Sequence, residues 1–254
     1  MIMKQLACLL IFSISFTAVK AQQLFIRNGT IIFEKKVNVQ RQWAESGLSE
    51  EARERMKKYK INHWEFSFDS SKSIFRPSKK EEESNENSFF GSIEESENEL
   101  YANYDQQKRI IKKKIWGEDY LLNDSIPKVE WKIMHDIRNI AGYDCRKAVG
   151  IINDSVYVVA FYTDEILLKG GPEGFSGLPG MILGLAIPRY FSTWFATKVT
   201  PYTEQSLAIN PPSKGKKTDT PKEFNKLIEI LTRYEQPQKQ KPEEVKKRLY
   251  GFTL

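Results

Sequence analysis

The chain has 254 residues, of which 40% are hydrophobic and 28% charged, and its formal net charge is +6. These proportions are typical of a globular protein and exclude a chain that is disordered throughout. Beyond the first apolar run, no stretch approaches the roughly 20 apolar residues that span a bilayer, so no transmembrane segment is predicted. The chain also lacks the aromatic–basic motif of a known nucleic-acid-binding module, which argues against nucleic acid as a partner.

Residues 1–21 have the pattern of a signal peptide. Lys4 precedes an apolar run over residues 6–19, and small residues occupy the two positions read by signal peptidase, Val19 and Ala21. We therefore expect export, with Gln22 as the first mature residue.

Residues 22–254 are long enough for one large domain, and no second domain boundary is evident. Once the signal peptide is removed, Cys145 is the single cysteine, so no intrachain disulfide can form. The stability of this domain must therefore come from its hydrophobic core.

The first part of the mature chain predicts strands and one helix. Residues 22–39 are β-rich and contain Asn28–Gly29, a pair that favours a tight hairpin turn, so one or two strands are expected there. Residues 49–60 have Ser49 as an N-cap, acids in the first turn and bases in the last, which indicates a short amphipathic helix.

A half-buried strand and a polar loop are predicted next. Trp64, Phe66 and Phe68 alternate with polar residues at the period of a strand. Residues 78–99 hold eight acidic residues and two lysines, and this composition predicts a disordered loop.

From residue 100 to 205 the chain is a succession of short strand patterns, with Asn153–Asp154 at hairpin spacing between two of them. A final helix is predicted from Thr220, and a basic tail from residue 237. The fold class expected is mainly β with some α: a curved antiparallel sheet or incomplete barrel, like that of periplasmic lipoprotein carriers, with a few packed helices.

Three segments carry a family resemblance: "IAGYDCRKAV", "VVAFYTDEI" and "GGPEGFSGLPGMILGL". Their order and spacing resemble the GLPGLI family of exported bacterial proteins. Gly177 to Gly180 match the first four letters of the motif, Met181 replaces the usual Leu, and Ile182 holds the last place. The resemblance covers most of the mature chain and implies a periplasmic or surface location in a bacterium with an outer membrane, but no established activity.

The stretch "GFSGLPGMILGL" is apolar for a segment so rich in turn residues. Pro172 suits a type I turn, and Pro179–Gly180 suit the centre of a type II turn, in which Gly180 would have a positive φ. Two interpretations stay open: the apolar side chains close one end of the sheet as a plug, or they form a preorganised site for a partner. The candidate binding residues are Pro172, Phe175, Gly177, Leu178, Pro179, Gly180, Met181 and Ile182.

Catalytic constellations are sparse. The mature chain has two histidines, His63 and His135, which cannot form a three-histidine metal site, so no metal and no cofactor are predicted. Cys145 is interpreted as a small core residue, with a nucleophile paired to His135 as the alternative. Ser176 lacks the first glycine of a Gly-x-Ser-x-Gly elbow, and no catalytic residue is assigned.

These patterns predict an exported, non-catalytic envelope protein that binds an apolar ligand such as a lipid, or an envelope protein. One alternative is a hydrolase that uses Cys145 or an acid pair brought together by the fold. Another is a structural component of a surface assembly. Nothing in the sequence predicts the oligomeric state.

Overall fold

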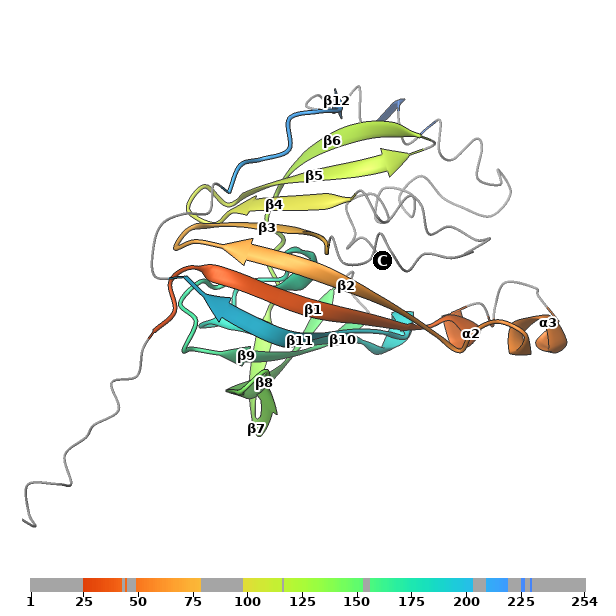
Figure 1. The fold of residues 1–254 in the computed structure, drawn as a ribbon, viewed down its shortest axis with the longest axis horizontal. Coiled ribbons are helices and arrows are strands. Elements are labelled where there is room, and N and C mark those ends of the chain that lie inside the picture. The colour runs from red at the N-terminus through yellow and green to blue at the C-terminus, as the bar shows by residue number, and fades with distance from the viewer. Residues whose placement is uncertain are drawn as a thin grey trace, which may run out of the picture.

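The computed structural model describes residues 25–42, 44, 49–78, 98–115, 117–152, 156–202, 209–218, 225–226 and 229. Nearly all of the regular structure is β, as the composition of short alternating segments predicts, and the helices are short. The prediction of a mainly β protein with a few helices is thus confirmed in its coarse form. Figure 1 shows the strands stacked side by side in one strongly twisted sheet.

The helical elements are α2 (Val39–Gln42), α3 (Glu50–Glu54), η2 (Pro172–Gly174) and η3 (Pro188–Tyr190). The strands are β1 (Gly29–Asn38), β2 (Tyr59–Phe68), β3 (Lys72–Pro77), β4 (Glu99–Asn103), β5 (Lys108–Ile115), β6 (Glu118–Ser125), β7 (Trp131–Ile140), β8 (Tyr143–Ile152), β9 (Val156–Thr163), β10 (Met181–Ile187), β11 (Ser192–Pro201) and β12 (Lys216–Lys217).

All strands belong to one 12-stranded sheet, in the order β12-β6-β5-β4-β3-β2-β1-β11-β10-β9-β8-β7. Every pairing is antiparallel except that of β12 with β6. The sheet consists of two meanders, β1–β6 and β7–β11, and the pairing of β1 with β11 joins them. The sheet is open, because β12 and β7 lie at its two ends.

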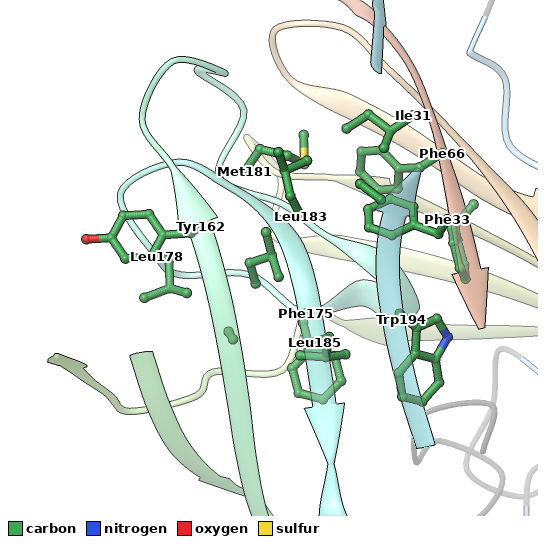
Figure 2. Packing of buried hydrophobic residues seen from close by; sticks show 14 of the residues in the cluster. Ile31, Phe33, Phe66, Tyr162, Phe175, Leu178, Met181, Leu183, Leu185 and Trp194 are labelled. Atoms are coloured by element: carbon green, nitrogen blue, oxygen red, sulfur yellow. The ribbon is translucent and has the colours of Figure 1, made fainter. Parts of the chain in front are cut away.

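The sheet curls around its own core. The η2 turn between β9 and β10 contacts β3 and β4, which lie several strands away in the sheet order. Phe33 packs edge-on against Phe66 and Phe75, with ring centroids 6.3 and 6.2 Å apart. Figure 2 shows part of this apolar cluster. The predicted inward alternation on β2 is confirmed, because Trp64, Phe66 and Phe68 are all buried.

The predicted hairpin at Asn28–Gly29 is wrong. Gly29 instead begins β1 and pairs with both Pro201 and Phe68, while Ile26 forms a parallel bridge with Ile166. Pairing with strands on both sides outweighs the turn propensity of Asn28–Gly29. Glycine serves close strand packing here, because a Cβ on Gly29 would lie 2.7 Å from the Thr200 carbonyl oxygen.

The helix predicted over residues 49–60 is shorter than expected. Ser49 does cap it, accepting a hydrogen bond from the Ala52 amide at 3.2 Å, but α3 ends at Glu54. The last two residues of the prediction, Tyr59 and Lys60, belong to β2, where they pair with β1. Backbone pairing with a neighbouring strand outweighs helix propensity at that end.

Several predictions fall wholly or mainly outside the described residues. They are the signal peptide, most of the acidic segment and the basic tail. At the end of the acidic segment, Glu99 already belongs to β4. Of the predicted C-terminal helix, Asn225, Lys226 and Glu229 are described, and they are helical and exposed. The turn at Asn153–Asp154 is not described, but the antiparallel pairing of β8 with β9 is.

No helix in the part of the chain that the structure describes has the length and apolar character needed to cross a membrane.

Candidate functional site

The GLPG segment, defined here as residues 170–182, covers the end of the β9–β10 connection and the first two residues of β10, and it lies against the core. The side chains of Phe175, Leu178, Met181 and Ile182 are each at most 1% exposed. Figure 2 shows Phe175, Leu178 and Met181 within the apolar cluster that also contains Phe33 and Trp194. The apolar residues of this segment are therefore core residues.

Specific contacts hold the GLPG segment in place. The Trp131 indole N–H donates a hydrogen bond to the Ser176 carbonyl at 2.8 Å, and the Trp131 ring lies 6.3 Å from that of Phe175. The Ile182 amide donates to the Gly170 carbonyl at 2.8 Å. The segment is thus fastened both to itself and to the beginning of β7.

This packing is the one that the plug interpretation describes. The four large apolar candidates are not displayed to solvent, and Pro172 is buried as well. Among the candidate binding residues, Gly177 and Pro179 are exposed. Binding of a partner by this segment stays a prediction, and it would have to use those two residues or their backbone.

The turn geometry differs from what the prolines predicted. A type I turn with Pro172 in its second position requires a negative φ at Glu173, but Glu173 has φ 56° and ψ 19°, and Gly174 has φ 77°. The Phe175 amide donates to the Pro172 carbonyl at 3.1 Å, so the turn is centred one residue later than expected. Two consecutive left-handed residues define a type I′ turn, with a non-glycine residue in its first central position.

The expectation that Gly180 has a positive φ is also wrong, because its φ lies outside the left-handed region. The residue with φ +95° is Gly177. Gly180 is required for a different reason: a Cβ built there would lie 2.0 Å from the Thr163 carbonyl oxygen and 2.9 Å from the Asp164 Cα. The backbone of the loop presses against the end of β9 at this point.

We expect Gly180→Ala to destabilise the fold by about 3 kcal/mol, because backbone atoms would have to move to admit a single methyl group. The matched control is Gly142→Ala, where φ is +91° but nothing lies within 4 Å of the added Cβ, so only left-handed strain of about 1–2 kcal/mol is expected. Urea denaturation followed by tryptophan fluorescence measures both. A smaller loss at Gly180 than at Gly142 would contradict the steric explanation.

An ion pair with a buried guanidinium and a partly exposed carboxylate lies next to the GLPG segment. The Arg109 side chain is 2% exposed, and its Nε and Nη2 donate to Asp124 Oδ2 at 3.3 and 2.7 Å. A Cβ on Gly174 would lie 3.7 Å from Arg109 Nη1, and the neighbouring Glu173 is fully buried. The fold thus brings Asp124 and the η2 turn to one guanidinium from distant segments, a juxtaposition with no sequence motif.

Cys145 on β8 is fully buried, as predicted for a core thiol. Its S–H points at the Tyr143 carbonyl, 3.5 Å away. Burial, reinforced by the negative charges of Asp144 and Glu165, raises the pKa of the thiol to about 12. A thiol that is seldom ionised at neutral pH is a poor nucleophile, so this environment argues against the alternative of a nucleophilic cysteine.

The histidines do not converge on a shared site. His63 lies on β2 and is half-buried, whereas His135 is exposed on β7, at the far end of the sheet order. Within the described ranges, no group of three or more His, Cys, Asp or Glu side chains is placed to hold a metal ion.

An open groove lies on the half of the sheet formed by β2–β5, under residues 209–214. Its volume is about 350 Å³. The sheet residues that line it are Ser67, Ile74, Arg76, Glu99 and Lys112, and the loop residues are Ile209, Asn210, Pro211, Pro212, Ser213 and Lys214. We call this the 209–214 groove.

The loop is anchored by a small apolar cluster: Ile209 packs with Ile74 and Tyr101, and Ile110 lies against them. After the groove, the chain joins the sheet as β12, and the Thr218 amide and hydroxyl both donate to the Leu121 carbonyl at 3.1 Å. Both ends of the loop are thus attached to the sheet, which keeps the groove between them.

Two of the cations in the groove are oriented by neighbouring acids. Arg76 donates to Glu65 Oε1 through Nε at 3.2 Å and through Nη2 at 2.8 Å. Lys112 Nζ lies 3.3 Å from Asp119 Oδ2. Lys214 is exposed and forms no ion pair with any residue that the structure describes.

None of the groove residues was singled out from the sequence. The groove residues come from four strands and one loop, so no local spacing connects them. The one sequence signal was Pro211–Pro212, which predicts a stiff, extended loop but says nothing about the surface under it.

The fold defines a class of protein: a mainly β domain built on one open, curled sheet that is antiparallel except at β12. The chain belongs to the family described as "N-glycanase peptide, N-terminal domain", which matches residues 78–220. No curated protein matches the chain.

The fold is similar to that of PNGF-II. For the structure in space group C2 the TM-score is 0.51 at 17% sequence identity, and the match covers 78% of this chain and 32% of PNGF-II. For the structure in space group P21 the TM-score is 0.48 at 20% identity, with 74% and 31% covered. This chain therefore spans about a third of PNGF-II, and at these identities the likeness shows the fold alone.

An uncharacterised conserved protein from Thermus thermophilus has a TM-score of 0.41 at 5% identity, with 81% of this chain and 98% of that one covered.

Proposed function

We propose that this chain is an exported, non-catalytic binding protein, and that its ligand is a glycosylated protein. The observation that carries the proposal is the 209–214 groove, an open recess that combines charged, amide, hydroxyl and apolar side chains. Sites that select a ligand typically combine apolar walls with a few placed polar groups.

The family supplies the class of ligand. Its description names the N-terminal domain of an N-glycanase, and that name points to N-linked glycans. A domain that binds such glycans without cleaving them would hold a glycoprotein in reach of a separate catalytic unit. The buried, rarely ionised Cys145 supports a non-catalytic role over the hydrolase alternative.

A protein ligand has more support than a lipid held inside the sheet. The apolar side chains of the GLPG segment, including Phe175 and Leu178, occupy the interior on which an apolar ligand would have to bind. The open ends of the sheet at β12 and β7 are compatible with an incomplete barrel like that of the lipoprotein carriers, which we retain as a proposal for the detailed architecture.

Export and a place in the bacterial envelope, periplasmic or at the surface, remain part of the proposal, as does membership of the GLPGLI group. They are supported by the apolar run over residues 6–19 and by the Gly177–Gly180 motif.

The test compares two forms of one immobilised, sialylated glycoprotein, before and after enzymatic removal of its N-glycans. We expect the full chain to bind the glycosylated form and not the stripped form, as measured by biolayer interferometry. Mass spectrometry of the glycoprotein after incubation should show its glycans intact. Equal binding to both forms, no binding to either, or released glycan would each overturn the proposal.

A further inference from the structure

We propose that the 209–214 groove binds an acidic sugar unit, one that carries a carboxylate, such as a sialic or uronic acid. This inference rests on the proposed function and names the part of the glycan that the groove selects. It is argued from the size, the charge and the mixed chemistry of the lining.

The size of the groove suits a short saccharide. At about 350 Å³ it lies near the lower end of the range of small-molecule sites, roughly 300–1,000 Å³. A recess of this size accommodates one or two sugar rings, whereas the rest of the glycan and its protein would remain outside.

Cations outnumber acids among the side chains that line the groove. Three cations, Arg76, Lys112 and Lys214, line it together with one acid, Glu99. Arg76 and Lys112 are already held by Glu65 and Asp119, so their positions are set before a ligand arrives.

The third cation has different surroundings. Lys214 belongs to the loop that lines the groove, and it forms no ion pair with the described residues. A ligand carboxylate between loop and sheet would therefore meet a cation that has no acidic partner among the described residues. Hydrogen bonds that involve an ionised group are the stronger ones, so the carboxylate would provide the main anchor.

The neutral part of the lining favours a sugar over a simple anion. Asn210, Ser213 and Glu99 supply the donors and acceptors that ring hydroxyls require. Ile74, Pro211 and Pro212 supply an apolar surface against which the carbon-bound hydrogens of a sugar ring can pack. A phosphate or sulfate ion would leave these residues without a role.

The experiment titrates the full chain with 3′-sialyllactose, with lactose as the neutral probe and inorganic phosphate as the anion-only probe, by isothermal titration calorimetry. We expect 3′-sialyllactose to bind, and lactose and phosphate to bind much more weakly. Lys112→Met and Lys214→Met should each weaken binding by roughly tenfold, because each removes one charge-assisted contact. The control is Lys132→Met, since Lys132 is exposed on β7 at the opposite edge of the sheet.

Thermal melting of each variant shows whether it is folded, and Lys214→Met, altered at an exposed position, keeps the test decisive if Lys112→Met is unstable. Equal binding of phosphate or of lactose, or groove variants that bind like Lys132→Met, would overturn the inference. If glycoprotein binding persists unchanged in the groove variants, this inference fails while the proposed function stands. If the unaltered chain does not bind the glycoprotein at all, the proposed function itself fails.

Discussion

Leu178→Asp is expected to lower the free energy of unfolding by about 4 kcal/mol or more. Leu178 is 1% exposed, so the substitution removes a buried side chain, which by itself costs about 2–5 kcal/mol when leucine is cut back to alanine. It also places a carboxylate in an apolar cluster, where no hydrogen-bond partner replaces the water it loses. Urea denaturation followed by tryptophan fluorescence measures the loss.

Leu167→Asp is the matched control, because it makes the same chemical change shortly before the GLPG segment at a side chain that is 44% exposed. We expect its effect to stay within about 0.5 kcal/mol. If Leu178→Asp does not fold, Leu178→Ala should still show a loss of about 2–5 kcal/mol. An unchanged unfolding midpoint for either Leu178 variant would contradict the plug interpretation and restore the partner site.

Arg109→Met is the second large effect, with an expected loss of about 3 kcal/mol, because charge-assisted hydrogen bonds of a buried guanidinium are lost. The substitution removes a guanidinium that is 2% exposed and leaves Asp124, whose carboxylate it binds at 2.7 Å, without that charge. Methionine is close to arginine in length, so the packing volume largely stays and the lost charge dominates. The loss is measured by urea denaturation at neutral pH, where the carboxylates are ionised.

Arg76→Met is an unusually close control for this comparison. The Arg76–Glu65 pair also joins Nη2 to a carboxylate oxygen, at 2.8 Å, and its carboxylate is 27% exposed, close to the 30% of Asp124. The two pairs differ in the guanidinium, which is 40% exposed in Arg76 and 2% exposed in Arg109. Exposed pairs contribute about 0–1 kcal/mol, so Arg76→Met should change stability little. Equal losses of stability for the two variants would contradict the prediction that burial of the Arg109 guanidinium makes Arg109→Met the more destabilising substitution.

The GLPG segment shows which features of a turn can be predicted from its own residues and which cannot. Its composition indicated a segment that is unusually apolar for a turn, and the structure shows why: Phe175 and Leu178 are core residues. The predicted role of Gly180 was wrong in mechanism, although a glycine is required there. The sequence reveals a turn residue, but the carbonyl of Thr163 that excludes a Cβ belongs to another element.

Periodicity along a single strand could be read from the sequence because it depends only on neighbouring residues. The inward alternation of Trp64, Phe66 and Phe68 is of this kind. The cap at Ser49 depends on a residue three positions away, and the burial of Cys145 was expected from its residue type in a β-rich stretch. Each of these features follows from the local chemistry of a few consecutive side chains.

Contacts between residues that are distant in the chain were determined by the tertiary structure alone. The pairing of β1 with β11, the pairing of Tyr59 with Asn38 on β1, and the approach of Arg109 to the GLPG segment all join residues far apart in the chain. The 209–214 groove is of the same kind, since its cations come from β3, β5 and the loop. The sequence by itself determined which faces of each strand are apolar, whereas the partners of those faces depend on how a 12-stranded sheet curls, and that is set by the packing of the whole core.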